Sequence, residues 1–200
     1  ISMAMGVLLV AGAKVRYIAL ISVLSIATVA AAFFGRLVDR YQITRLEALI
    51  NPDGIDSDFT YQAENAMRAI GTGGLWGKGW LQGPLTNGRD IPVMWADFPF
   101  AAVGEQFGLI GCAAMLVLLG VALIRIWRIA HLSRDLLGTY ICAGVFTMLL
   151  WQIFQNVGMT LQIMPVTGLP LPFISYGGSG LIVYFAMFGL VQSVHMRRMR

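Results

Sequence analysis

The chain has 200 residues, of which 58% are hydrophobic and 12% charged, and its formal net charge is +4. A soluble domain has about 45–50% apolar and about 25% charged residues, so this composition excludes an ordinary soluble protein and indicates an integral membrane protein. The only cysteines, Cys112 and Cys142, lie in apolar segments, where thiols behave as small hydrophobic groups. We predict an all-α fold, a polytopic bundle of transmembrane helices that forms a single membrane domain over residues 1–200.

The apolar segments, taken in chain order, predict one partial and four complete membrane spans. Residues 1–13 are too short to cross a hydrocarbon core of about 30 Å, which takes about 20 helical residues. We therefore interpret them as the end of a longer span, and the chain as the C-terminal part of a larger protein. The complete spans are predicted at 17–34, 98–124, 138–164 and 181–194. The last of these is short, and we expect it to take residues from the glycine-rich loop that precedes it.

Basic residues predict which side of the membrane each connection faces. The regions 14–16, 125–135 and 195–200 hold eight basic residues and one acid, a net charge of +7, whereas segment 35–97 has a net charge of −2. Short loops rich in Lys and Arg stay in the cytoplasm. The C-terminus is therefore predicted to be cytoplasmic, and segment 35–97 and loop 168–180 to be extracytoplasmic. This topology accounts for the basic excess, so no nucleic-acid partner is expected.

The large outer loop 35–97 is predicted to contain short amphipathic helices, at 37–50 and 61–70, with a turn at 51–54 between them. The glycine-rich stretch 71–79 that follows is not a Walker A loop, because Thr72 and Gly79 stand where that motif needs Gly and Ser or Thr. Two interpretations stay open. The stretch is either a flexible connection with an incidental lysine, or a site where Lys78 and exposed backbone N–H groups contact an anionic lipid headgroup or a pyrophosphate.

Two carboxylates mark the start of the span 98–124. Asp97, followed by Pro99 in the first turn, fits a helix N-cap. A general base is the second interpretation, and it requires partial desolvation, because a cap favours the ionised form and makes the carboxylate a weaker base. Glu105 lies about 12 Å deeper, where a carboxylate normally faces a bundle interior and has a partner. Candidate partners on the next span are Gln152, Gln155 and Asn156.

Loop 168–180, Gly/Pro-rich and flanked by two spans, is the most informative part of the chain. Its thirteen residues include two prolines, four glycines, two serines and a tyrosine. Backbone this irregular cannot face lipid, because each unpaired N–H or C=O group would cost several kcal/mol in hydrocarbon. We therefore expect the loop to be buried in protein or to line a wet cavity.

Four blocks of the chain, 69–80, 95–105, 155–159 and 164–179, carry a resemblance to a known family. They resemble the SEDS proteins (shape, elongation, division and sporulation), bacterial peptidoglycan polymerases that include RodA and FtsW. The resemblance covers nearly the whole chain in the right order. The ending 191–195 is more similar to RodA than to FtsW.

The resemblance implies a peptidoglycan glycosyltransferase in the bacterial cytoplasmic membrane, with a role in cell shape, cell division or sporulation. Such an enzyme joins lipid II units on the extracytoplasmic face, releases undecaprenyl pyrophosphate and works with a class B penicillin-binding protein. Asp97 matches the catalytic aspartate of the family, and we expect it to act as a general base. The substrate-binding candidates are Lys78 and Arg68 near the pyrophosphate, Glu105 in the cavity wall, and Ser175 and Tyr176 on the outer rim.

No metal ligands are assigned, although a divalent cation, Mg²⁺ or Mn²⁺, is an alternative to a basic side chain for stabilising the leaving group. Two other functions also stay open. One is a lipid II flippase or transporter, since broken helices and intramembrane carboxylates occur in transporters as well. The other is a non-catalytic scaffold for a cell-wall synthase.

Overall fold

The computed structural model describes residues 2–34, 58–88 and 94–198, and all regular elements in these ranges are helices, which confirms the predicted all-α fold. The helices are α1 (Ser2–Val10), α2 (Val15–Phe34), α4 (Asp58–Gly73), α5 (Pro84–Asn87), α6 (Met94–Asp97), α7 (Pro99–His131), α8 (Leu136–Thr160) and α9 (Gly178–Arg198). The predicted helix at 37–50 and the turn at 51–54 lie outside the described residues.

Within the described residues, α7, α8 and α9 are long and apolar enough to cross a membrane. Helix α9 begins at Gly178, so the last span does take residues from the glycine-rich loop. Helix α8 ends at Thr160, four residues earlier than predicted, because Gln162 adopts a positive φ of 57° and the following N–H groups turn back to the carbonyl of Gly158. Helix α2 has 20 residues, close to the predicted span.

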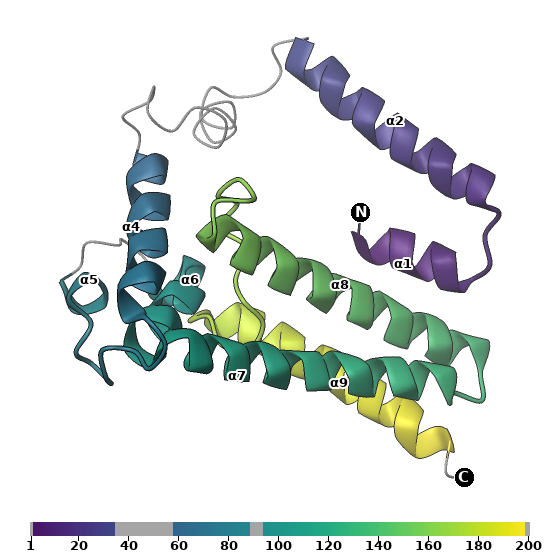
Figure 1. Ribbon diagram of the computed structural model, residues 1–200. Helices are drawn as coiled ribbons and strands as arrows, with labels where there is room; N and C mark the ends of the chain where they lie inside the picture. Colours follow the sequence, from purple (N-terminus) through teal and green to yellow (C-terminus); the bar gives the residue numbers. More distant parts are fainter. Residues whose placement is uncertain (1, 35–57, 89–93, 199–200) are drawn as a thin grey trace.

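Helices α7, α8 and α9 form the bundle, with α1 packed along α8 and α4 lying across the end of the bundle where α7 begins (Figure 1). Large apolar side chains on the outside of α7, such as Val117, Leu118 and Ile124, are exposed, as expected of a surface that faces lipid. A core between the three main helices contains Leu123, Ile126, Ala130, Cys142, Val145, Leu149, Tyr184 and Val191.

The two ends of this bundle differ. At one end, which we call the loop end, α4, α6, the start of α7, the end of α8 and the loop 161–177 meet (Figure 1). Here α4 extends the helix predicted at 61–70, and its fully buried Ala66 and Ala69 pack against Phe98, Ala101 and Met159. We call the opposite end, formed by the turn 132–135 and the last turn of α9, the basic end.

Candidate functional site

Helix α7 is broken at Gly108, close to the loop end. The backbone there has φ 65° and ψ −161°, a conformation that is essentially restricted to glycine. In an unbroken helix the N–H groups of residues 109 and 110 would bond the carbonyls of residues 105 and 106. The break frees all four groups in a segment where unpaired backbone is costly.

The loop 73–79 that follows α4 inserts into this break and pairs with all four groups. Each hydrogen bond that α7 loses is replaced by two bonds to the loop. The N–H groups of Lys78 and Gly79 donate to Glu105 O (2.9 Å) and Gln106 O (3.0 Å), and Gly74 O and Leu75 O accept from the N–H groups of Leu109 (2.9 Å) and Ile110 (3.3 Å).

This insertion uses N–H groups of the loop that were considered as anion ligands. The N–H groups of Lys78 and Gly79 are bonded to α7, and that of Gly77 donates to Gly73 O at 2.9 Å. The loop is also not a flexible connection with an incidental lysine, because its backbone completes α7. Glycine is needed for the close approach: a Cβ on Gly77 would collide with the carbonyl of Gln106, and one on Gly73 with that of Gly104.

We expect Gly108→Ala to destabilise the protein by at least about 2 kcal/mol, because the strained backbone alone costs about 1–3 kcal/mol with a side chain present. The added Cβ would also lie 2.5 Å from Gly77 N and 2.6 Å from Leu75 O. Gly120→Ala is the matched control, since a Cβ on Gly120 of the same helix meets nothing within 4 Å. It should be neutral or stabilising by up to about 1 kcal/mol. Thermal unfolding of the full-length protein in detergent measures both, and equal melting temperatures for the two variants would contradict this account.

Lys78 and Glu105 form an ion pair beneath the inserted loop. The distance from Lys78 Nζ to Glu105 Oε1 is 3.0 Å, and the same ammonium donates to Thr72 Oγ1 at 2.8 Å. The Glu105 side chain is completely buried, whereas that of Lys78 is 28% exposed. The partner of Glu105 is thus a lysine of the loop 73–79, and the expectation of a partner among Gln152, Gln155 and Asn156 is not met.

Glu105 also supplies the cap that α5 lacks. The N-cap of α5, Gly83, has no side chain to cap with, and the carboxylate of Glu105 instead accepts the N–H groups of Leu85 (3.2 Å) and Thr86 (2.8 Å). Its neighbour Gln106, which the sequence analysis did not single out, accepts from Leu81 N at 3.2 Å. Two adjacent polar residues of α7 therefore hold the segment 78–86 in place.

Arg68 lies on α4 and is not part of this network. Its guanidinium is 3.4 Å from Glu64, one turn earlier in the same helix, and the Arg68 side chain is 68% exposed. The two predicted cationic residues therefore lie in different environments. Lys78 is neutralised by a buried carboxylate, and Arg68 extends into solvent.

Asp97 is the last residue of α6 and does not cap α7. The N-cap of α7 is Phe98, with no side-chain capping bond, so the cap interpretation of Asp97 is wrong. The side chain of Asp97 is half-buried. A Cβ built on Gly168 would lie 3.8 Å from Asp97 Oδ1, so the carboxylate faces the backbone of the Gly/Pro-rich loop.

Asn156, completely buried near the end of α8, joins Asp97 to that loop. Its Nδ2 donates to Asp97 O at 2.9 Å and to Leu169 O at 2.8 Å. Its Oδ1 is buried and has no hydrogen-bond partner among the described residues. Buried polar atoms of this kind are normally satisfied by water or a ligand. Asn156 therefore positions Asp97 and leaves an acceptor atom at the same junction.

Ser175 and Tyr176 differ in what they offer a ligand. Ser175 is buried, and its Oγ accepts from Leu171 N at 2.6 Å, which closes the turn of the loop. The backbone N–H of Tyr176 donates to Trp95 O at 2.9 Å, and this bond fastens the loop to α6. The Tyr176 ring is 78% exposed and free to meet a ligand at the surface of the loop end.

In the parts of the chain that the structure describes, no three His, Cys, Asp or Glu residues lie close enough together to hold a metal ion. None of the chemistry below is assigned to a metal ion. The loop end offers one half-buried carboxylate beside irregular backbone, an exposed cation on α4 and a buried ion pair that fastens segment 78–86 to α7.

Comparisons with known proteins show the family to which the chain is similar. A family model described as "FTSW_RODA_SPOVE: Cell cycle protein" matches residues 1–200. The chain is 37% identical over 192 residues to the peptidoglycan glycosyltransferase MrdB of Escherichia coli (96% of this chain, 52% of MrdB). It is 35% identical over 164 residues to the peptidoglycan glycosyltransferase RodA of Treponema pallidum (82% of this chain, 38% of RodA). It is 33% identical over 192 residues to the stage V sporulation protein E of Bacillus subtilis (92% and 50%).

A solved structure is similar as well. It is described as "Structural coordination of polymerization and crosslinking by a peptidoglycan synthase complex", and its matching chain is 28% identical with a TM-score of 0.77. The match covers 98% of this chain and 54% of that chain. The chain thus spans about half the length of MrdB (52%) and about half the length of the matching chain in the solved structure (54%).

Proposed function

This chain belongs to the FtsW, RodA and SpoVE family, and we propose that it carries the catalytic base of a peptidoglycan glycosyltransferase. The substrate in this proposal is lipid II, whose units are joined into glycan strands with release of undecaprenyl pyrophosphate. The observation that carries the proposal is the placement of Asp97 at the junction of α6, α8 and the Gly/Pro-rich loop, half-buried and facing Gly168.

A carboxylate in this position suits general-base catalysis. A hydroxyl oxygen of the acceptor sugar attacks C1 of the donor sugar, its proton passes to Asp97, and the C1–O bond to the pyrophosphate breaks. The leaving group takes the bonding electrons as undecaprenyl pyrophosphate. One base is sufficient for such a displacement. The unpaired Oδ1 of Asn156 supports the presence of a hydroxyl or a water at this junction.

The two cations have different parts in the proposal. Arg68 is exposed, and its ion-pair partner among the described residues is Glu64 on the same helix. Arg68 is therefore the candidate for stabilising the charge that develops on the pyrophosphate. Lys78 is held by Glu105 and Thr72, so we assign it mainly to positioning the wall of the site. Glu105 organises that wall and does not act on the sugar.

The proposed orientation places the loop end outside the cytoplasm. The basic end carries Arg134 and Arg197, which fits the preference of basic connections for the cytoplasmic side. The catalytic face is then extracytoplasmic, in the bacterial cytoplasmic membrane, and the C-terminus is cytoplasmic. The similar solved structure is described as a synthase complex of polymerization and crosslinking. That description supports a class B penicillin-binding protein as the partner.

A lipid flippase is the second candidate, because a broken helix such as α7 is a feature of transporters. In transporters the freed backbone groups coordinate the transported ion or solute. Here the loop 73–79 bonds all four of them, which favours the polymerase.

The deciding experiment uses the full-length protein with a class B penicillin-binding protein and labelled lipid II. We expect wild-type protein to extend lipid II into glycan chains, seen as a ladder on a gel, and not to move it across sealed vesicles. Translocation without a ladder would establish the flippase instead. Activity that appears only when a separate polymerase is added would establish the scaffold.

A further inference from the structure

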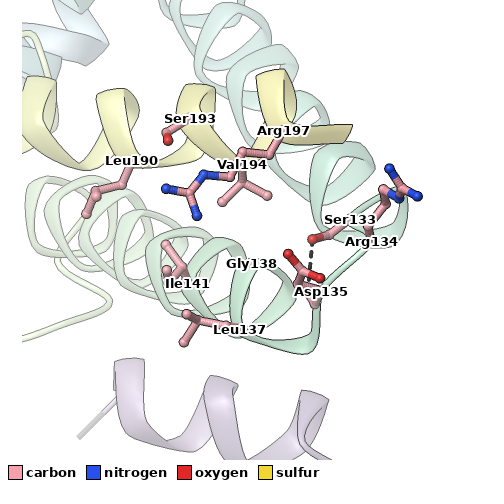
Figure 2. Close-up of a pocket in the computed structure, with 10 residues that line it drawn as sticks. All are labelled: Ser133, Arg134, Asp135, Leu137, Gly138, Ile141, Leu190, Ser193, Val194 and Arg197. Carbon is pink, nitrogen blue, oxygen red and sulfur yellow. Dashed lines mark hydrogen bonds between the residues drawn. The ribbon is translucent and has the colours of Figure 1, made fainter. Parts of the chain in front are cut away.

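A second site lies at the basic end of the bundle, away from Asp97. A cavity of about 250 Å³ opens between the turn 132–135, the first turns of α8 and the last turns of α9. Figure 2 shows the guanidinium of Arg197 lying between α9 and α8, with Arg134 at the outer side on the turn. The cavity is lined by Ser133, Arg134, Asp135, Leu137, Gly138, Ile141, Leu190, Ser193, Val194 and Arg197.

This lining has a polar part and an apolar part. Two arginines and Ser193 supply hydrogen-bond donors, whereas Leu137, Ile141 and Leu190 provide an apolar wall between the helices. Neither arginine forms an ion pair with a carboxylate of the described residues. Asp135, the remaining charged group, lies beside Ser133, whose hydroxyl donates to the Asp135 backbone carbonyl at 3.0 Å (Figure 2). The cavity is therefore net positive.

Helix α8 adds to the positive potential. It begins at this cavity, and its N-cap Asp135 makes no side-chain capping bond. The N–H groups of its first turn and the positive end of its dipole favour an anion at this place. A phosphate group with apolar chains attached would satisfy the arginines, the helix start and the apolar wall together.

We propose that this cavity binds the phosphodiester headgroup of an anionic phospholipid from the leaflet at the basic end. The phosphate lies beside the guanidinium of Arg197 in the groove, with Arg134 at the outer rim, and one acyl chain follows the groove past Leu190 and Ile141. Basic pockets between membrane helices recognise anionic lipid headgroups in this way, and each arginine near the surface contributes about 1 kcal/mol. This site is independent of the proposed polymerase chemistry.

Native mass spectrometry of the full-length protein, titrated with dioleoyl phosphatidylglycerol, tests the proposal. We expect Arg197→Gln and Arg134→Gln each to weaken lipid binding about fivefold, which corresponds to about 1 kcal/mol. Ser193→Trp should abolish binding at this site without a change of charge, because the indole fills the groove. Dioleoyl phosphatidylcholine should bind weakly to all variants.

Arg125→Gln is the matched control, because Arg125 is an exposed arginine near the same end of α7 but does not line the cavity. It should change the affinity less than twofold. Equal losses for Arg125→Gln and Arg197→Gln would show diffuse surface attraction and overturn the site. Unchanged binding to Ser193→Trp would overturn the groove. Displacement of the lipid by millimolar inorganic phosphate would identify a free-anion site instead of a lipid site.

Discussion

Replacing Asp97 by Asn should reduce the rate of glycan polymerisation by about 10²–10⁴-fold, the range that a general base contributes. The amide keeps the size of the side chain and its contacts with the loop at Gly168 but cannot take the proton of the acceptor hydroxyl. Gel analysis of glycan chains made from labelled lipid II, with the full-length protein and a class B penicillin-binding protein, measures the effect. The side chain is half-buried, and the amide has nearly the same size and shape, so the packing around residue 97 should be kept.

The control for this experiment is the melting temperature, which should stay close to that of the wild type in Asp97→Asn. A chemical test separates a base from a structural group. Asp97→Ala opens space beside Gly168, so added formate should restore part of the activity, whereas Asp97→Asn leaves no space and should not respond. Normal glycan chains from either variant without formate would remove Asp97 from the mechanism.

The fold was largely predictable because hydrophobic length is a local property. Apolar runs located α7, α8 and α9 and the helical content of the chain. Even the extension of α9 into the glycine-rich loop followed from counting residues, since the apolar segment 181–194 was too short by itself. The end of α8 was less accurate, because the positive φ of Gln162 is not suggested by its residue type.

The candidate site was only partly predictable, because its contacts join segments far apart in the chain. Lys78 and Glu105 were each singled out, but their pairing depends on the insertion of loop 73–79 into a broken helix. The glycines around both residues indicated that another segment packs closely there, but they did not indicate which segment. Asp97 shows the converse error. Asp with Pro two residues later is a good local N-cap pattern, yet Asp97 ends the short helix α6 and Phe98 is the N-cap of α7.

The roles of Asn156 and Gln106 illustrate the same limit. Asn156 was one of three candidate partners for Glu105, and it instead bonds the backbone at Asp97 and Leu169. Gln106 stands next to Glu105 but bonds a different part of the outer segment. A polar residue in a membrane helix can be predicted to have a partner, but its identity follows from the tertiary structure.

Glu105→Ala should have the largest effect on stability of the changes considered. Removing one partner from a buried ion pair typically costs about 3–5 kcal/mol, because the remaining charge stays uncompensated. Here Lys78 would lose its carboxylate, and the N–H groups of Leu85 and Thr86 would lose their acceptor. For a chain of this size we expect the melting temperature of the protein in detergent to fall by about 10 °C.

The exposed pair Glu64–Arg68 provides the matched control, because Glu64→Ala removes an ion pair whose acidic partner is 39% exposed instead of buried. Its loss should cost less than about 1 kcal/mol.

The melting temperature of Glu105→Gln should fall between those of the two alanine variants, since the amide oxygen can still accept one N–H bond. Adding Lys78→Met to Glu105→Leu should recover part of the stability, because no unpaired charge then remains beneath the loop. One kcal/mol corresponds to about 2–4 °C in melting temperature. Melting of Glu105→Ala within about 2–3 °C of Glu64→Ala would therefore show that the carboxylate does not hold segment 78–86 against α7. The backbone bonds at the break would then hold that segment alone.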